Sequence, residues 1–168
     1  RQGTAVHDFL HPARVVIGGD DAVAIEIVAD LYAGVDSPVL KMKTASAEAL
    51  KYAANAFLAT KLTFINAMAD ICEVVGADIF DVASGIGLDP RIGKDMLSAG
   101  PGWGGSCFPK DTRALVSIAA EGGYDFALLR GVIETNDQHY ARIADKVISE
   151  CGGSVRGMTV AAWGLTFK

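Results

Sequence analysis

The sequence predicts a mainly α-helical domain built on one long helix and flanked on both sides by partial α/β pieces. Apolar residues recur at helical spacing from 46 to 75 with no internal Gly or Pro. A strand, helix, strand pattern precedes this stretch, and a second candidate strand region follows it at 158–163 (MTVAAW). We therefore expect three segments, 1–43, 44–151 and 152–168, of which the middle one is helical.

Residues 1–43 have the pattern of the end of an α/β unit. The run 14–18 (RVVIG) predicts a buried strand, 22–32 an amphipathic helix, and 38–43 (PVLKMK) a second strand. These elements form a compact strand, helix, strand unit, which is the end of an α/β domain.

The middle segment begins with a helix of about thirty residues, well above the typical length of about 11–12. Thr44 or Ser46 is expected to cap its start, and Gly76 to end it. A helix this long spans a domain or packs against a partner chain. Shorter helices are expected at 79–83, 112–120 and 126–149. They are followed by a linker at 152–154 and a strand at 158–163.

Composition excludes several classes of partner. The 168 residues are 51% apolar with a formal charge of −5, so no basic field favours nucleic acid or an anionic membrane. No apolar run is long enough to cross a bilayer. Three cysteines, without disulfide or metal-ligand spacing, indicate a reducing, cytoplasmic location and no metal site.

The most informative stretch is Gly100–Arg113 (GPGWGGSCFPKDTR), in which a glycine-dense loop leads to Cys107. Pro109 suits the first turn of a helix, so Cys107 is predicted just ahead of a helix N-terminus. Unpaired amides there, together with Lys110, favour the thiolate, which is the nucleophilic form. Cys107 is therefore a candidate nucleophile, whereas Cys72 is expected to be a core residue and Cys151 to have no role.

Asp111 and the pair Lys51 and Asn55 each allow two interpretations, one catalytic and one purely structural. Asp111 follows Cys107 by about one helical turn, where it can orient a water molecule or merely complement the helix dipole. Lys51 and Asn55 share a helix face and can donate to a developing oxyanion, or simply face solvent. Trp103 can pack on a sugar or fill the core. The histidines show no ligand spacing and are assigned no chemistry: His7, His11 and His139.

Three stretches, 51–59 (KYAANAFLA), 102–111 (GWGGSCFPKD) and 164–168 (GLTFK), resemble the UDP-glucose 6-dehydrogenase family, and the resemblance covers essentially the whole chain. It implies that 1–43 is the C-terminal part of an NAD-binding Rossmann domain. Residues 44–151 would be a central helical dimerisation and catalytic domain with a core like that of 6-phosphogluconate dehydrogenase. Residues 152–168 would be a linker and the first strand of a UDP-binding domain.

The resemblance also implies a reaction, the NAD-dependent four-electron oxidation of UDP-glucose to UDP-glucuronate through a thiohemiacetal and a thioester on Cys107. Lys51 and Asn55 would steady the oxyanion or the attacking water, and Asp111 would serve hydrolysis. No dinucleotide fingerprint Gly-x-Gly-x-x-Gly follows a strand, so the 168 residues alone are expected to be inactive. The product would supply polysaccharide synthesis.

The resemblance also implies a homodimer formed through the long helix, which is compatible with a higher oligomer. The remaining site residues that it implies would contact NAD or UDP-glucose. The family usually has Glu where this chain has Gln2, so water activation would depend more on Asp111 or on a carboxylate just before this segment. The implied cofactor contacts are Gln2, Ser106 and Lys110. The implied substrate contacts are Lys51, Asn55, Arg91, Gly102, Trp103, Gly104, Phe108, Phe167 and Lys168.

Three alternatives remain at this level. The substrate can be another nucleotide sugar, of the GDP-mannose or UDP-N-acetyl-hexosamine type. The segment can be a non-catalytic helical dimerisation module in which Cys107 is a spare thiol. Cys107 can also be a redox sensor, although no resolving cysteine lies near it in the sequence.

Overall fold

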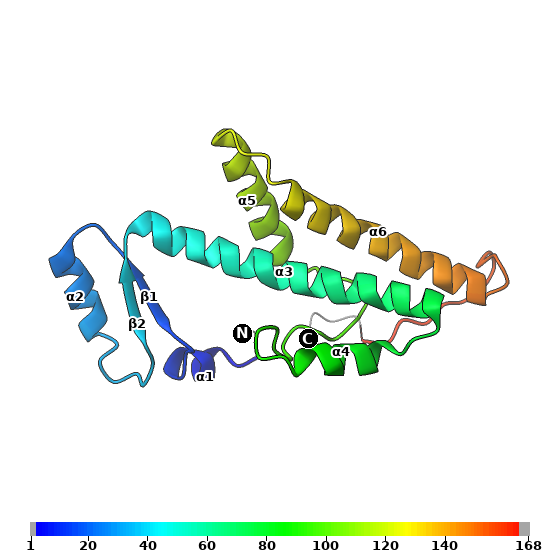
Figure 1. The fold of residues 1–168 in the computed structure, drawn as a ribbon, viewed down its shortest axis with the longest axis horizontal. Coiled ribbons are helices and arrows are strands. Elements are labelled where there is room, and N and C mark those ends of the chain that lie inside the picture. The colour runs from blue at the N-terminus through cyan, green and yellow to red at the C-terminus, as the bar shows by residue number, and fades with distance from the viewer. Residues whose placement is uncertain (1–2, 165–168) are drawn as a thin grey trace. The chain divides into compact units, whose positions relative to one another are not determined.

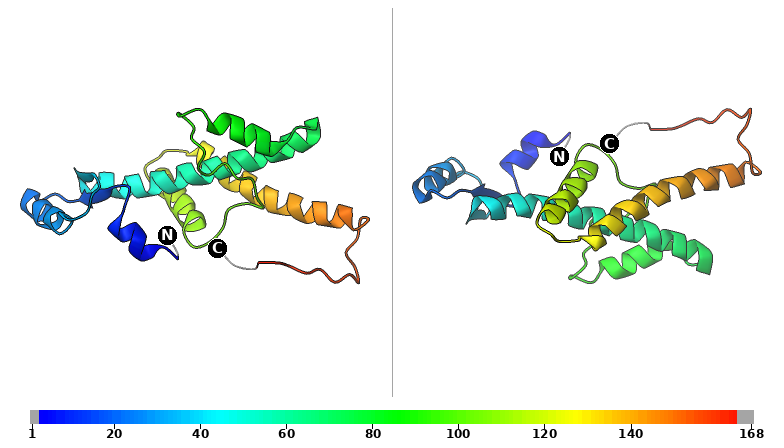
Figure 2. Two further views of the ribbon diagram at one scale, coloured as in Figure 1. Left: turned by 90° about the horizontal axis from the view of Figure 1, so that it is seen from below. Right: turned by 90° about the horizontal axis from the view of Figure 1, so that it is seen from above.

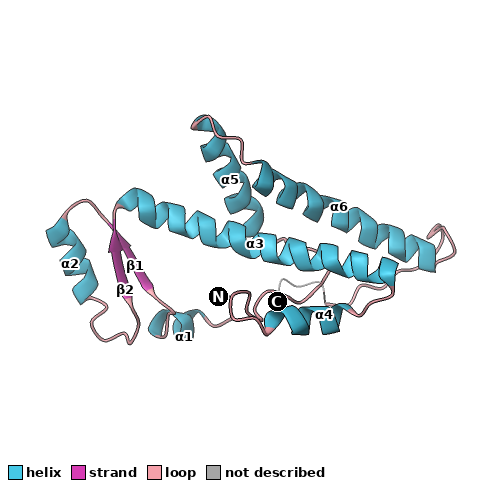
Figure 3. Cartoon of the chain, viewed as in Figure 1, coloured by secondary structure: helices cyan, strands magenta, loops and turns pink. Residues whose placement is uncertain are grey.

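The computed structural model describes residues 3–164, and most of them are helical (Figure 3). The chain divides into two compact units at Ala53 and Ala54, a point inside the long helix. The expected mainly α architecture is confirmed.

The first unit contains the predicted strand, helix, strand pattern. Its elements are α1 (Ala5–Leu10), β1 (Val15–Gly18), α2 (Ala22–Asp30) and β2 (Val39–Met42). The strands pair in parallel with Val15 opposite Val39. β1 ends close to the start of the long helix, since a Cβ on Gly18 would lie 2.6 Å from the Cβ of Ala47.

The second unit contains most of α3 (Thr44–Val75), with α4 (Ile79–Gly87), α5 (Phe108–Glu121) and α6 (Ala127–Glu150). α3 has 32 residues and begins at Thr44, and the cap expected at Thr44 or Ser46 stays a prediction. It ends at Gly76, which takes φ +73°, and the amide of Ala77 donates to the carbonyl of Cys72 (2.9 Å). α6 follows the second half of α3 in the same chain direction (Figures 1 and 2).

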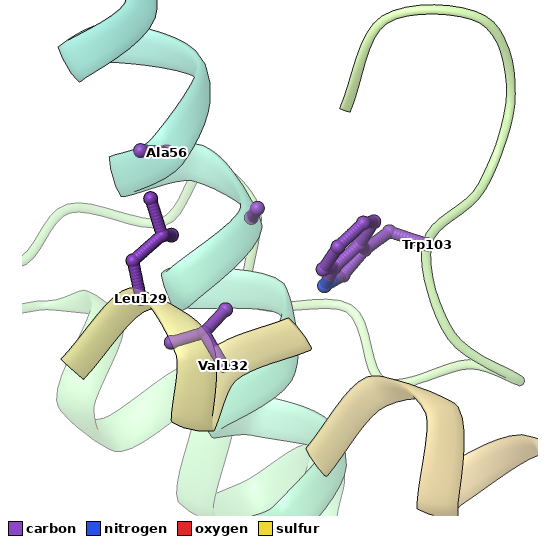
Figure 4. Close-up of a cluster of buried hydrophobic side chains, with 5 residues drawn as sticks. Ala56, Trp103, Leu129 and Val132 are labelled. Atoms are coloured by element: carbon purple, nitrogen blue, oxygen red, sulfur yellow. The ribbon is translucent and has the colours of Figure 1, made fainter. Parts of the chain in front are cut away.

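The core of this unit lies between α3 and α6. Ala56 and Ala59 from α3 pack with Leu129 and Val132 from α6, and the indole of Trp103 enters from a loop (Figure 4). Small residues on α3 leave room for the larger side chains facing them. The core thus joins the two helices to the glycine-dense loop.

The strand expected at 158–163 is wrong, because the structure has irregular backbone there. A strand needs a neighbour for its backbone hydrogen bonds, and within residues 3–164 the only strands, β1 and β2, pair with each other. Val160 and Trp163 are exposed. Across the same residues, every helix is too short or too polar to cross a membrane.

Candidate active site

Cys107 occupies the N-cap of α5, as predicted, and its side chain is exposed. The helix begins at Phe108, with Pro109 in its first turn as expected, and so extends four residues ahead of the range 112–120. The amide of Asp111 donates to the carbonyl of Cys107 at 2.8 Å. Cys107 is therefore an exposed thiol at the start of a helix, where the helix dipole is positive.

Asp111, one turn further along α5, is buried, with only 3% of its surface exposed. Its Oδ2 accepts from Asn55 Nδ2 at 2.5 Å, and its Oδ1 accepts from Lys110 Nζ at 2.6 Å. The structure thus brings together two predicted catalytic residues that lie 56 positions apart in the sequence. A buried carboxylate held by an amide and an ammonium group stands one helical turn from the thiol.

Ser106 and Lys110, both predicted cofactor contacts, lie on either side of Cys107 in the sequence. Ser106 Oγ is 3.7 Å from Cys107 Sγ, and the serine is exposed. The side chain of Lys110 is 72% exposed although its ammonium group pairs with Asp111. An exposed serine hydroxyl therefore lies close to the thiol, and a largely exposed lysine side chain follows three residues further along the chain.

Lys51 lies one turn before Asn55 on α3, is exposed, and belongs to the first unit. Arg91 is also exposed, and its guanidinium binds both carboxylate oxygens of Asp89. The side-chain hydrogen bonds from Arg91 hold the pKa of Asp89 below its ordinary value, and Asp89 raises the pKa of Arg91. Asp89 therefore orients an arginine that is open to solvent.

Trp103 fills the core, which is one of the two roles considered for it. The ring is 5% exposed and meets Phe108 edge-on at 6.2 Å between centroids. The substrate contacts proposed for Gly102, Trp103, Gly104 and Phe108 stay predictions. Gln2, Phe167 and Lys168 lie outside the described residues.

The sequence analysis missed a group of buried polar residues that hold the loop before Cys107. Asn136 and His139 on α6 are both buried, and His139, which was assigned no chemistry, lies between Asp70 Oδ2 (3.2 Å) and the carbonyl of Gly100 (2.9 Å). Their positions continue the spacing of Leu129 and Val132 along one face of α6. That spacing was a usable signal that both residues face the core.

Residues 3–164 contain no cluster of three potential metal ligands. Asp70 is instead surrounded by the imidazole of His139 and by two cations, Arg142 and Lys146. Lys146 also pairs with Glu73, whose hydrogen bond is the main cause of a raised pKa at Lys146. These ion pairs connect α3 and α6 beyond the core.

Comparison with known proteins defines the class. Residues 45–138 match the central domain of the UDP-glucose/GDP-mannose dehydrogenase family, and the match covers more than half of the chain. The chain belongs to this family.

The curated relatives include UDP-glucose 6-dehydrogenase TuaD of Bacillus subtilis, 52% identical over 168 residues, which are 100% of this chain and 36% of that protein. UDP-glucose 6-dehydrogenase of Rhizobium meliloti is 48% identical over 173 residues, covering 100% of this chain and 40% of that protein. The chain therefore spans little more than a third of the length of these relatives.

Solved structures agree with the fold. A UDP-glucose dehydrogenase from the hyperthermophilic archaeon Pyrobaculum islandicum superposes with a TM-score of 0.85 at 40% identity, covering 91% of this chain and 35% of that one. GDP-mannose dehydrogenase from Pseudomonas aeruginosa gives a TM-score of 0.53 at 30% identity, covering 89% of this chain and 35% of that one.

Proposed function

We propose that the whole protein is an NAD-dependent dehydrogenase that oxidises UDP-glucose to UDP-glucuronate, with Cys107 as its covalent nucleophile. The observation that carries this proposal is the exposed cysteine at the N-terminus of α5, one turn from the buried Asp111. The substrate comes from the relatives, several of which are UDP-glucose 6-dehydrogenases.

Cys107 acts on the aldehyde formed from the sugar C6 alcohol by the first two-electron oxidation. Its thiolate adds to the carbonyl carbon, and the resulting oxyanion takes a proton to give a thiohemiacetal. Loss of a hydride from that carbon and of the hydroxyl proton gives a thioester. Water then adds to the thioester and expels the thiolate, which releases the carboxylate.

Asp111 and Asn55 take part in hydrolysis in this proposal. Asp111 accepts a proton from the attacking water, and Asn55 orients the carboxylate through its 2.5 Å hydrogen bond. Lys51, one turn earlier on α3, supplies a cation to the oxyanion. Arg91, oriented by Asp89, is available to an anionic part of the substrate.

Among the described residues, Lys110 and Ser106 are the two proposed to bind NAD, and they would form a small part of its site. A lysine ammonium and a serine hydroxyl suit phosphate and ribose oxygens, and Lys110 and Ser106 supply these groups within three residues of Cys107 in the sequence. Other parts of the protein are proposed to supply most of the site, since no Gly-x-Gly-x-x-Gly pattern follows a described strand. The match at 100–105 (GPGWGG) lies in the loop before α5. When bound, NAD supplies the acceptor for both hydrides.

The homodimer is proposed to form through α3. Phe57, Phe64 and Ile71 recur every seven residues on this helix, and each is at least half exposed (66%, 54% and 51%). Residues spaced by seven share one side of a helix, and an exposed apolar stripe marks an interface. A second copy of the same helix is the partner that the proposal assigns to this stripe.

The test of the nucleophile is Cys107→Ala in the full-length protein, assayed with UDP-glucose and NAD. We expect uronate formation to fall below detection, because no thioester can form. Cys151→Ala is the matched control, since Cys151 is partly exposed and was assigned no role; it should keep normal activity. Near-normal uronate production by Cys107→Ala would contradict the assignment.

A further inference from the structure

One face of α3 carries three buried polar residues, and all three bind the segment 100–111. Asn55 donates to Asp111, Thr63 Oγ1 accepts from the indole Nε1 of Trp103 (2.7 Å), and Asn66 Oδ1 accepts from the amide of Gly100 (2.8 Å). Positions 55 and 66 are about three helical turns apart, and position 63 lies within about 80° of both around the axis, so the three residues share one side of the helix over about 16 Å.

Residues of α6 also form hydrogen bonds with this loop. Asn136, 3% exposed, accepts from the Trp103 amide (2.9 Å) and donates to the Trp103 carbonyl (3.1 Å). The hydroxyl of Tyr140 donates to that carbonyl at 2.5 Å, and His139 Nε2 bonds the carbonyl of Gly100 at 2.9 Å. The backbone of Gly100 and Trp103 is therefore held at both N–H and both C=O groups.

The interface between α3 and α6 changes from apolar to polar along its length. Its first half is apolar, with Ala56 and Ala59 facing Leu129 and Val132. Its second half is polar, with Thr63 and Asn66 on α3 and Asn136 and His139 on α6. Burying four polar side chains is costly unless each finds a partner, and the glycine loop supplies a partner to every one of them.

We propose that Thr63 and Asn136 are positioning residues for the reaction of Cys107, and this inference rests on the proposed function. A loop rich in glycine has wide conformational freedom of its own. The two side chains remove this freedom at Trp103, four residues before the nucleophile. Cys107 is thereby held between two fixed points, Trp103 on one side and the Asn55–Asp111 pair on the other.

The role differs from ordinary fold stabilisation, and a matched set of variants separates the two. Thr63→Val keeps the shape of the side chain but removes the acceptor of the Trp103 indole, and Thr63→Ser retains it. Asn136→Ala removes both backbone bonds to Trp103. Leu129→Ala is the control, because it opens the same core without touching a hydrogen bond of the loop.

Three quantities are measured on full-length protein: amide exchange at 100–104, the rate of iodoacetamide labelling of Cys107, and kcat with UDP-glucose. Peptide mapping separates Cys107 from Cys151, which is also partly exposed. We expect Thr63→Val and Asn136→Ala to exchange faster at the loop, to change the labelling rate at least threefold and to lower kcat at least tenfold. Thr63→Ser and Leu129→Ala should stay within threefold of the wild type in labelling and kcat.

Unchanged labelling and kcat in Thr63→Val and Asn136→Ala would overturn the proposal, even if loop exchange rises. An equal loss of kcat in Leu129→Ala would also overturn it, because general destabilisation would then explain the effect. If the wild-type protein oxidises no nucleotide sugar, the proposed function fails. The labelling rates then decide by themselves whether these residues position Cys107.

Discussion

Gly102 packs against Tyr140 and Asn136 of α6, and Gly102→Ala is a sharp structural test of that packing. Gly102 takes φ +120°, a region that residues with a Cβ rarely adopt. A Cβ there would lie 2.8 Å from the ring of Tyr140 and 3.0 Å from Asn136 Oδ1. Neither neighbour can move without breaking its hydrogen bond to Trp103.

The expected magnitude follows from two costs. The unfavourable backbone conformation costs about 1–3 kcal/mol, and overpacking a filled site costs about 1–3 kcal/mol. Gly102→Ala should therefore destabilise the second unit by about 2–6 kcal/mol, a large part of a typical stability of about 5–15 kcal/mol.

Gly104→Ala is the control for this experiment, because the nearest atom to its added Cβ is Tyr140 Oη at an ordinary 3.5 Å. Urea unfolding of full-length protein, followed by hydrogen exchange in peptides from 44–151, reports on this unit. With a urea dependence of about 1–3 kcal/mol per M, the midpoint should fall by about 1 M or more for Gly102→Ala only. Equal midpoints for the two variants would refute the reasoning.

Two further predictions concern the dimer stripe and the Arg91 pair. Phe57→Glu should leave a folded monomer because Phe57 is exposed, whereas Ile65→Glu should prevent folding because Ile65 is fully buried. Sedimentation measures the oligomeric state and circular dichroism measures folding. A dimeric Phe57→Glu protein would argue against a dimer formed through the exposed apolar stripe of α3. Asp89 has a lowered pKa, so the stabilisation from its pair with Arg91 is complete above the ordinary value near 3.8 and is lost as pH falls through the lowered pKa. Arg91→Ala should raise the Asp89 pKa toward its ordinary value in an NMR titration, and an unmoved pKa would show that the pair does not set it.

Local pattern was sufficient to predict most elements of the fold. The spacing of apolar residues placed the long helix within two residues of its observed start, and Gly76 ended it as expected. The first turn of α5 followed from Pro109, which placed Cys107 at the N-cap. These features depend on neighbours in the sequence, so no tertiary information was needed.

Other features depend on contacts that the sequence does not reveal. The run 158–163 has strand propensity, but a strand also needs a partner, and none pairs with it within residues 3–164. Asn136 and His139 looked like polar residues of an ordinary helix, and only the fold shows that they face the loop at Trp103 and Gly100. The Asn55–Asp111 bond joins positions too distant for spacing to relate them.

The most direct test of the central claim is the stoichiometry of the full-length protein with UDP-glucose and NAD, with NADH and uronate followed together. The account predicts two NADH per uronate, and complete loss of uronate on Cys107→Ser. One NADH per molecule of oxidised sugar, or a Cys107→Ser protein that still forms the acid, would contradict a four-electron route through a thioester on Cys107.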